Sequence, residues 1–193
     1  MNLNQFVKNI YSRCIGIIAS PKEEWIKIKS EDASFFQLIT NFLLPLLILT
    51  AGASVIGSYF QMVGSGFAFD ILVIAGLLSF FSILISVLLS ILAVNSMIRT
   101  FGGTPNLMQA SKLVVYSFVP GILVVIIFVL IPWLYILGLF FLYSFVIFFQ
   151  GTPVLLNISR QRQSNFSILS SAMILIIYLV ISFILSSFFG TIK

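Results

Sequence analysis

The sequence predicts an all-α integral membrane protein, a bundle of five transmembrane helices preceded by amphipathic N-terminal helices. Hydrophobic residues make up 60% of the 193 and charged residues only 8%, whereas a soluble domain carries about 25% charged residues. The apolar residues gather in five uncharged stretches, and nearly all the bases fall on one side of them. Such a chain cannot cover a water-facing surface, so we expect lipid to be its solvent.

The five apolar stretches are 35–59, 71–98, 113–131, 133–149 and 166–189. A helix needs about 20 residues to cross a hydrocarbon core of roughly 30 Å. We therefore expect an interfacial cytoplasmic segment over 1–34 and a five-span transmembrane domain over 35–193.

The third and fourth stretches are separated by little more than Pro132. A single helix over 113–149 would be about 55 Å long, too long for one crossing. We predict two short helices joined by a tight turn at Ile131-Pro132-Trp133. Trp133 is then an expected interface anchor, because tryptophan is enriched at the headgroup level.

The distribution of bases supports this count. If all five stretches cross, one side receives nine of the ten Lys and Arg residues and the other side receives only Lys193. The nine are Lys8, Arg13, Lys22, Lys27, Lys29, Arg99, Lys112, Arg160 and Arg162. By the positive-inside rule, we expect a multi-pass protein of the cell inner membrane, with a cytoplasmic N-terminus and its C-terminus on the outer side.

The N-terminal segment has the pattern of an amphipathic helix. Its apolar residues recur at three- and four-residue spacings, as Leu3, Phe6, Val7, Ile10, Cys14, Ile17 and Ile18. This helix either lies in the cytoplasmic interface or packs its apolar face on the bundle.

A second short helix is expected to begin at Ser20-Pro21. We predict that Ser20 caps it and that Glu23 completes a capping box. Trp25 lies on its apolar face and is a second expected interface anchor.

Small polar residues recur on the second span. Ser82, Ser86 and Ser90 share one helical face with Ser79 and Ala93. Such residues let helices approach closely, so we favour a packing face. A polar lining of a pathway is the alternative.

Other polar and kinking residues stand within or beside the spans. Pro45 and Pro120 are expected to bend their helices. Asn41 and Asn95 are the most polar buried candidates, and Asn95 lies one turn from Arg99. We expect Arg99 and Lys112 to reach headgroups from the span ends.

The tripeptide Gly-Thr-Pro occurs twice, as Gly103-Thr104-Pro105 and as Gly151-Thr152-Pro153, 48 residues apart. Each is predicted to open a helix after a span. This repeat fits either a duplicated helical hairpin or convergence on a sequence that starts helices well.

Composition argues against several classes of function. The chain has no histidine and a single cysteine, Cys14, so the commonest metal ligand and general base are missing. We therefore expect no catalytic residues, no cofactor and no metal. The bases are too few and too scattered for a nucleic-acid surface.

Three features together resemble the Yip family, named for Ypt-interacting proteins. Ser20-Pro21-Lys22-Glu23-Glu24-Trp25 resembles the Ser-Pro-x-x-x-Trp element of bacterial members, and Phe101-Gly102-Gly103 with Val115-Tyr116-Ser117-Phe118-Val119-Pro120 resembles the stretch around the family's third span. The five-span layout matches as well. The resemblance implies partner binding in membranes without catalysis. Only about 34 residues precede the first span, which speaks against the GTPase binding of eukaryotic members.

The expected function is therefore membrane organisation or scaffolding through lipid or protein contacts. The lipid bilayer, a second copy and other membrane proteins are the expected partners. The alternative is a transporter or channel for a lipid or small amphiphile.

Overall fold

The computed structural model describes residues 3–62 and 69–190, without the side chains of 3, 135–137 and 189–190. Lys193, the predicted outer base, and the side chain of Leu3 lie outside the described part. The elements are α1 (Leu3–Ala19), α2 (Pro21–Ser30), α3 (Phe35–Leu38), the π-helical turn η1 (Ile39–Leu43), α4 (Leu44–Met62), α5 (Phe69–Thr100), α6 (Leu107–Ser117), α7 (Val119–Leu130), the 3₁₀ segment η2 (Pro132–Phe140), α8 (Phe141–Leu155) and α9 (Arg160–Gly190).

Five helical segments are long and apolar enough to cross a membrane, which confirms the predicted helical membrane bundle. They are Phe35–Met62, Phe69–Thr100, Leu107–Leu130, Gly138–Leu155 and Arg160–Phe188. The fourth differs most from its predicted bounds, because its first residues belong to the 3₁₀ segment after Pro132.

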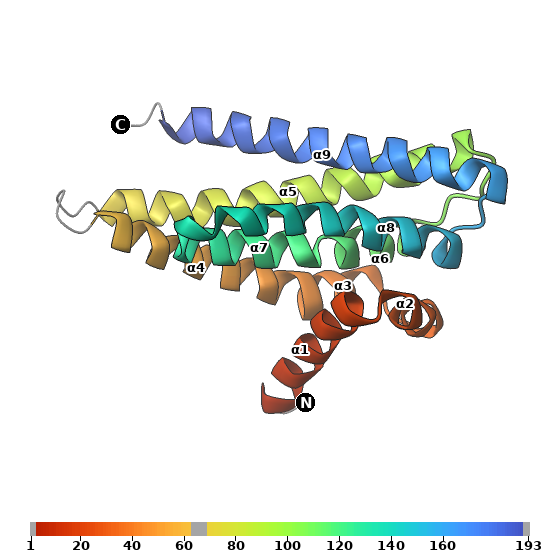
Figure 1. Cartoon of the computed structure of the whole chain (residues 1–193), viewed down its shortest axis with the longest axis horizontal. Coiled ribbons are helices and arrows are strands. Elements are labelled where there is room, and N and C mark those ends of the chain that lie inside the picture. Colours follow the sequence, from red (N-terminus) through yellow and green to blue (C-terminus); the bar gives the residue numbers. More distant parts are fainter. Residues whose placement is uncertain (1–2, 63–68, 191–193) are drawn as a thin grey trace.

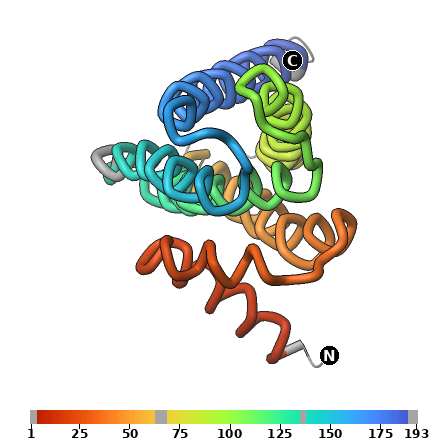
Figure 2. The backbone as a smooth tube through the Cα atoms, turned by 90° about the vertical axis from the view of Figure 1, so that its right-hand side faces the viewer, coloured from red at the N-terminus to blue at the C-terminus, as the bar shows by residue number. Residues whose placement is uncertain are grey.

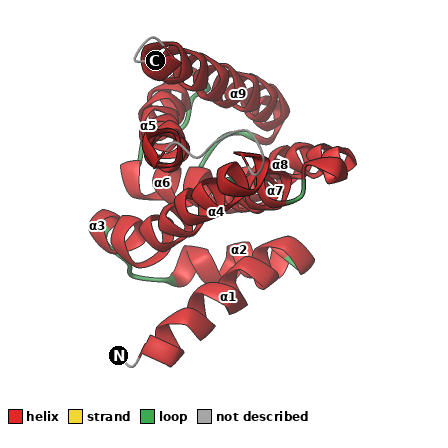
Figure 3. Cartoon of the chain, turned by 90° about the vertical axis from the view of Figure 1, so that its left-hand side faces the viewer, coloured by secondary structure: helices red, strands yellow, loops and turns green. Residues whose placement is uncertain are grey.

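The long helices run side by side along the longest axis of the molecule (Figure 1). Seen along that axis, α1 and α2 form a layer of their own beneath α4, α7 and α8, and α5 and α9 lie on the opposite side (Figures 2 and 3). The core between the spans contains the fully buried Val87, Val114 and Ile147.

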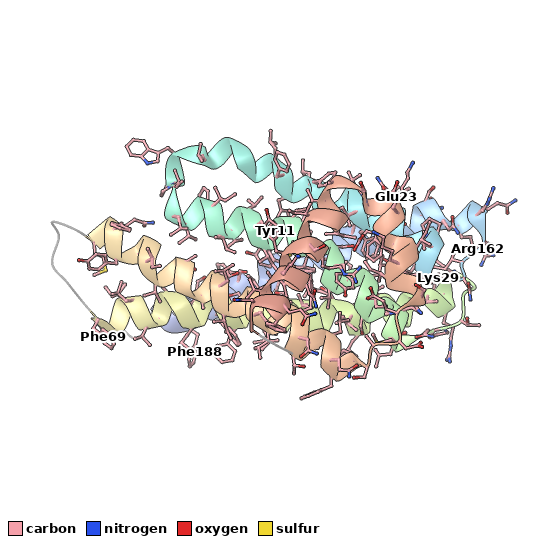
Figure 4. The ribbon with its side chains drawn as sticks, turned by 90° about the horizontal axis from the view of Figure 1, so that it is seen from below. Tyr11, Glu23, Lys29, Phe69, Arg162 and Phe188 are labelled. Atoms are coloured by element: carbon pink, nitrogen blue, oxygen red, sulfur yellow. The ribbon has the colours of Figure 1, made fainter. Side chains whose placement is uncertain are left out.

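Charged side chains gather at one end of this bundle. Figure 4 shows Glu23, Lys29 and Arg162 toward that end, with Phe69 and Phe188 toward the other. We call it the basic end, toward which α2, the end of α5 and the start of α9 lie (Figure 1).

The predicted turn at Pro132 is confirmed. α7 ends at Leu130, and Ile131 leaves the helix with φ −136°, as expected for a residue that precedes proline. The chain then returns, so that α8 packs against α7.

The two span prolines distort their helices in different ways. Pro120 has no N–H for the carbonyl of Tyr116, and the third span breaks at Phe118 into α6 and α7. Pro45 likewise cannot donate to the carbonyl of Asn41, and the preceding turn is widened so that Leu44 N–H reaches Ile39 O.

The two Gly-Thr-Pro copies differ in structure. Pro105 precedes α6, whose N-cap is Asn106, with its side chain accepting from Gln109 N–H at 3.1 Å. Pro153 instead lies in the last turn of α8. The prediction that the second copy opens a helix is therefore wrong, because α8 continues through Thr152, whose hydroxyl donates to Phe148 O.

Candidate functional site

Trp25 joins α2 to the bundle. Its indole is fully buried, and Nε1 donates to the carbonyl of Ile147 on α8 at 3.1 Å. Gly151 lets the ring approach, since a Cβ there would lie 2.5 Å from Trp25 Cε2. The prediction that Trp25 anchors in the lipid interface is corrected, because the apolar face of α2 packs on α8 and encloses the ring in protein.

Lys112 holds the other end of α2. Its side chain is only 3% exposed, and Nζ donates to Ile28 O at 2.8 Å and to Glu31 O at 2.7 Å. A cation suits the last carbonyls of a helix, which lack helical donors and carry the negative end of its dipole. The prediction that Lys112 reaches headgroups is therefore wrong.

Tyr143 completes the attachment of the N-terminal helices. Its hydroxyl on α8 donates to the carbonyl of Ile18, in the last turn of α1, at 2.8 Å. Together the side chains of Trp25, Lys112 and Tyr143 form what we call the clamp. The clamp satisfies carbonyls at the C-terminal ends of both α1 and α2.

The start of α2 differs from its prediction. Ser20 is the N-cap residue, but its side chain makes no capping hydrogen bond. Its backbone N–H bonds to Gly16 O at 2.9 Å, so α1 runs almost directly into α2. The capping box lies instead at the first span, where Ser34 and Gln37 bond reciprocally.

Four charged side chains form a cluster beside the clamp. Arg13 Nη1 donates to Glu24 at 2.5 Å and its Nη2 pairs with Glu31. Lys27 Nζ lies 3.0 Å from the second oxygen of Glu24. Burial alone would lower the pKa of Arg13, but Tyr116 and the Glu31 and Glu24 carboxylates raise it, so the guanidinium stays charged.

Cys14 lies on the packed side of α1 and is 8% exposed. Burial raises the pKa of its thiol to about 11. Since the thiolate is the reactive form, this cysteine is unreactive at neutral pH.

α1 has two apolar stripes with different surroundings. Cys14 and Ile17 are buried against the rest of the protein, whereas Val7, Tyr11 and Ile15 are exposed. The helix therefore packs on the bundle along one side and presents an apolar stripe on another.

A cavity of about 510 Å³ lies between α1, α2 and the first span. Its polar lining includes Arg13, Glu24 and Lys27, with Asn41 beside the widened turn. Phe6, Ile10 and Phe42 supply apolar walls, and Asn9 and Ser12 complete the lining. The cavity therefore has both polar and apolar side chains in its lining.

The serine stripe is part of a helix contact. Ser82 is 8% exposed, and Ser86 and Ser90 are fully buried. Met97 is seven residues beyond Ser90 and shares its face, and the Met97 sulfur accepts from Ser170 of α9 at 3.7 Å. The stripe therefore points toward α9.

The other predicted site residues are dispersed. Asn95 has a buried Oδ1 that no described donor reaches, and Arg99 is exposed at the basic end. Pro120 lines an apolar groove of about 230 Å³ with Ile18 of α1. Trp133 is 86% exposed beyond α7, a position open to a lipid interface.

Sequence reasoning missed the residues that make the clamp and the cluster. Tyr143 and Gly151 carry no recognisable signal in the sequence. One signal in the sequence does point to the clamp. Lys112 is a base that immediately precedes the apolar stretch beginning at Leu113. A buried base next to a span requires a nearby acceptor.

The acidic side chains near the cavity are held in ion pairs. Among the described residues, no group of three or more His, Cys, Asp or Glu side chains is placed to hold a metal ion. Glu24 is already bonded through both oxygens, to Arg13 and to Lys27. The cavity beside it has an ion-paired rim and is lined by both polar and apolar side chains.

Comparison with known proteins identifies the family. No curated protein matches the chain significantly, and no solved structure does. The family model of the Yip1 domain matches residues 15–184, which include the clamp, the charged cluster except Arg13, and all five candidate spans almost completely. The chain therefore belongs to the Yip1 domain family of multi-pass membrane proteins.

Proposed function

We propose that this Yip1-domain protein organises membranes or membrane partners without catalysis, through lipid and protein contacts of its N-terminal helices. The observation that carries the proposal is the attached N-terminal pair. α1 and α2 are clamped to the bundle, yet α1 still presents Val7, Tyr11 and Ile15 outward. An exposed apolar stripe beside a charged cavity suits contacts at a membrane surface.

The proposed orientation puts the basic end in the cytoplasm, with the C-terminus on the outer side of an inner membrane. Nine of ten bases support it through the positive-inside rule. In a Cys14→Ser background, Lys29→Cys should react with a membrane-impermeant maleimide only in inverted vesicles. Trp133→Cys should react only from the opposite side, and the reverse pattern would refute this orientation.

Site-specific crosslinking tests the contact function. A photoreactive amino acid at Tyr11, which is 66% exposed, should yield crosslinks to lipid, to a second copy or to another membrane protein. The same group at Trp133, on the far side of the third span, serves as the control position. Proximity to GTPases is not expected. A strict monomer with no adduct at Tyr11 would remove the basis of the proposal.

A transporter or channel for a lipid or small amphiphile is the second candidate. The half-polar cavity and the break at Pro120 favour it. The buried serine stripe argues against it, because Ser86 and Ser90 lie in a helix contact. In proteoliposomes, Ser86→Leu should abolish flux if the stripe lines a pathway. Under the packing interpretation it should lower stability, and no flux should be present in the unmodified protein.

A further inference from the structure

We propose that the cavity between α1, α2 and the first span binds the phosphate-bearing headgroup of a single phospholipid from the leaflet at the basic end. This inference deepens the proposed function by naming the ligand class at one site. It rests on the position of the cavity along the first span, on the spare donors of Lys27 and Arg13, and on the apolar walls.

The length of the first span indicates how deep in the membrane the cavity lies. Its 28 residues extend about 42 Å at 1.5 Å per residue, roughly 12 Å more than the hydrocarbon core. About 6 Å then projects at each end. Asn41 is six residues past Phe35, or about 9 Å along the helix. The cavity at Asn41 therefore lies at the boundary where phospholipid phosphates meet acyl chains.

Spare hydrogen-bond donors at the cavity rim can bind a phosphate, although Glu24 and Glu31 balance the charges of Arg13 and Lys27. An ammonium has three N–H donors, and Lys27 uses one on Glu24 at 3.0 Å while its side chain remains 66% exposed. Arg13 has five donors, and each of its terminal nitrogens is bonded to one carboxylate. Both cations therefore retain donors that phosphate oxygens can accept from.

The apolar walls distinguish a lipid from a soluble phosphate. Phe6, Ile10 and Phe42 line the cavity together with the polar groups. They offer contact to the glycerol and first acyl carbons, which a soluble phosphate lacks.

The test uses the full-length protein in proteoliposomes containing phosphatidylethanolamine with a diazirine close to its glycerol. Mass spectrometry should map adducts to Phe6, Ile10 or Phe42. Diacylglycerol with the same diazirine should give few adducts there, because it lacks the phosphate. Equal labelling by the two lipids would overturn the proposal.

Two pairs of variants sharpen the test. Lys27→Gln should reduce labelling about fivefold, as expected for one base near a lipid surface, while Lys29→Gln, an exposed base on the same helix, should leave it unchanged. Ser12→Phe fills the cavity and should abolish labelling, whereas Asn4→Phe on the far side of α1 should not. Labelling that survives both Lys27→Gln and Ser12→Phe would refute the site.

A competition separates lipid from soluble ligand. Excess glycerophosphoethanolamine, which has the headgroup but no chains, should not displace the photolipid. Displacement would identify a soluble phosphate site and contradict the proposal. Crosslinking to partners from Tyr11 is measured independently. If lipid labelling is lost while partner adducts at Tyr11 remain, the lipid site is refuted and the proposed function is not.

Discussion

The two ends of the chain are attached to the bundle by different means. α1 and α2 are held by three polar side chains, each of which donates to a helix carbonyl. α9 contacts α5 and α8, and Tyr178 of α9 still packs against Phe141 of α8. Beyond Ile174, none of the described side chains of α9 is buried, and Phe183 is 72% exposed.

The difference reflects the solvent that each segment meets. Lipid tails are as apolar as the side chains of α9, so covering that helix with protein gains no hydrophobic free energy. Its backbone is satisfied internally, as a span requires. The ends of α1 and α2 instead leave carbonyls that need donors, and the clamp supplies them.

The largest effect is expected from the clamp tryptophan. Trp25→Ala removes a buried ring and a hydrogen bond, and should lower the free energy of unfolding by about 3–5 kcal/mol. Trp133→Ala, which loses an exposed ring, should change it by less than about 0.5 kcal/mol. Equilibrium unfolding in mixed detergent micelles measures both. Equal losses would contradict the contrast between the two tryptophans.

A smaller loss is expected at the second clamp residue. Lys112→Met keeps the length of the side chain but leaves two carbonyls without their charged donor, at a cost of about 2 kcal/mol. Trypsin should then cleave faster after Lys27 and Lys29, because α2 detaches more often. Arg99→Met removes an exposed base at the same end and is the control. Unchanged cleavage in Lys112→Met would show that α2 is held by packing alone.

The protection of the Cys14 thiol from alkylation gives a pH-dependent measure of how firmly α1 packs on the bundle. Its pKa is raised from 9.0 to about 11 by burial, so the folded state favours the protonated thiol. The stability due to this group should be constant below about pH 9 and fall as pH rises through 11. Alkylation should be slow at pH 8 and accelerate about tenfold per pH unit up to 11. Fast alkylation at pH 7 would refute a buried thiol.

The smallest effect is expected on the outer half of α9. Phe183→Ala should change stability by less than about 0.5 kcal/mol. Phe166→Ala, at a fully buried position of the same helix, should cost about 3–5 kcal/mol. Unfolding of the two variants under one set of conditions compares them directly. A large loss at Phe183 would indicate a protein partner on that face.

The spans were predictable because lipid imposes length and composition on each segment separately. The turn at Pro132 followed from the length limit and the distribution of bases, and Pro45 and Pro120 distort their helices through the missing N–H. These features depend on residues close together in sequence.

The site was not predictable in the same way. Helix packing decides which backbone carbonyls accept from Trp25 and Lys112. The side chains of the accepting residues, Ile147, Ile28 and Glu31, do not indicate this in the sequence. The roles of Arg13 and Glu24 depend on the sharp turn between α1 and α2. The two Gly-Thr-Pro copies show the same limit, because their surroundings decide whether the helix starts or continues.

The clamp has a consequence for how the protein is made. The bonds that hold α1 and α2 connect residues 84, 122 and 125 positions apart. At about 5–20 residues per second, roughly 6–25 s separate the synthesis of α1 and α2 from that of α8. Until α8 is made the clamp is incomplete, because only Lys112 can have reached α2. Ribosome-bound chains that stop before Tyr143 should therefore expose α2 to protease, and chains extended past Gly151 should protect it.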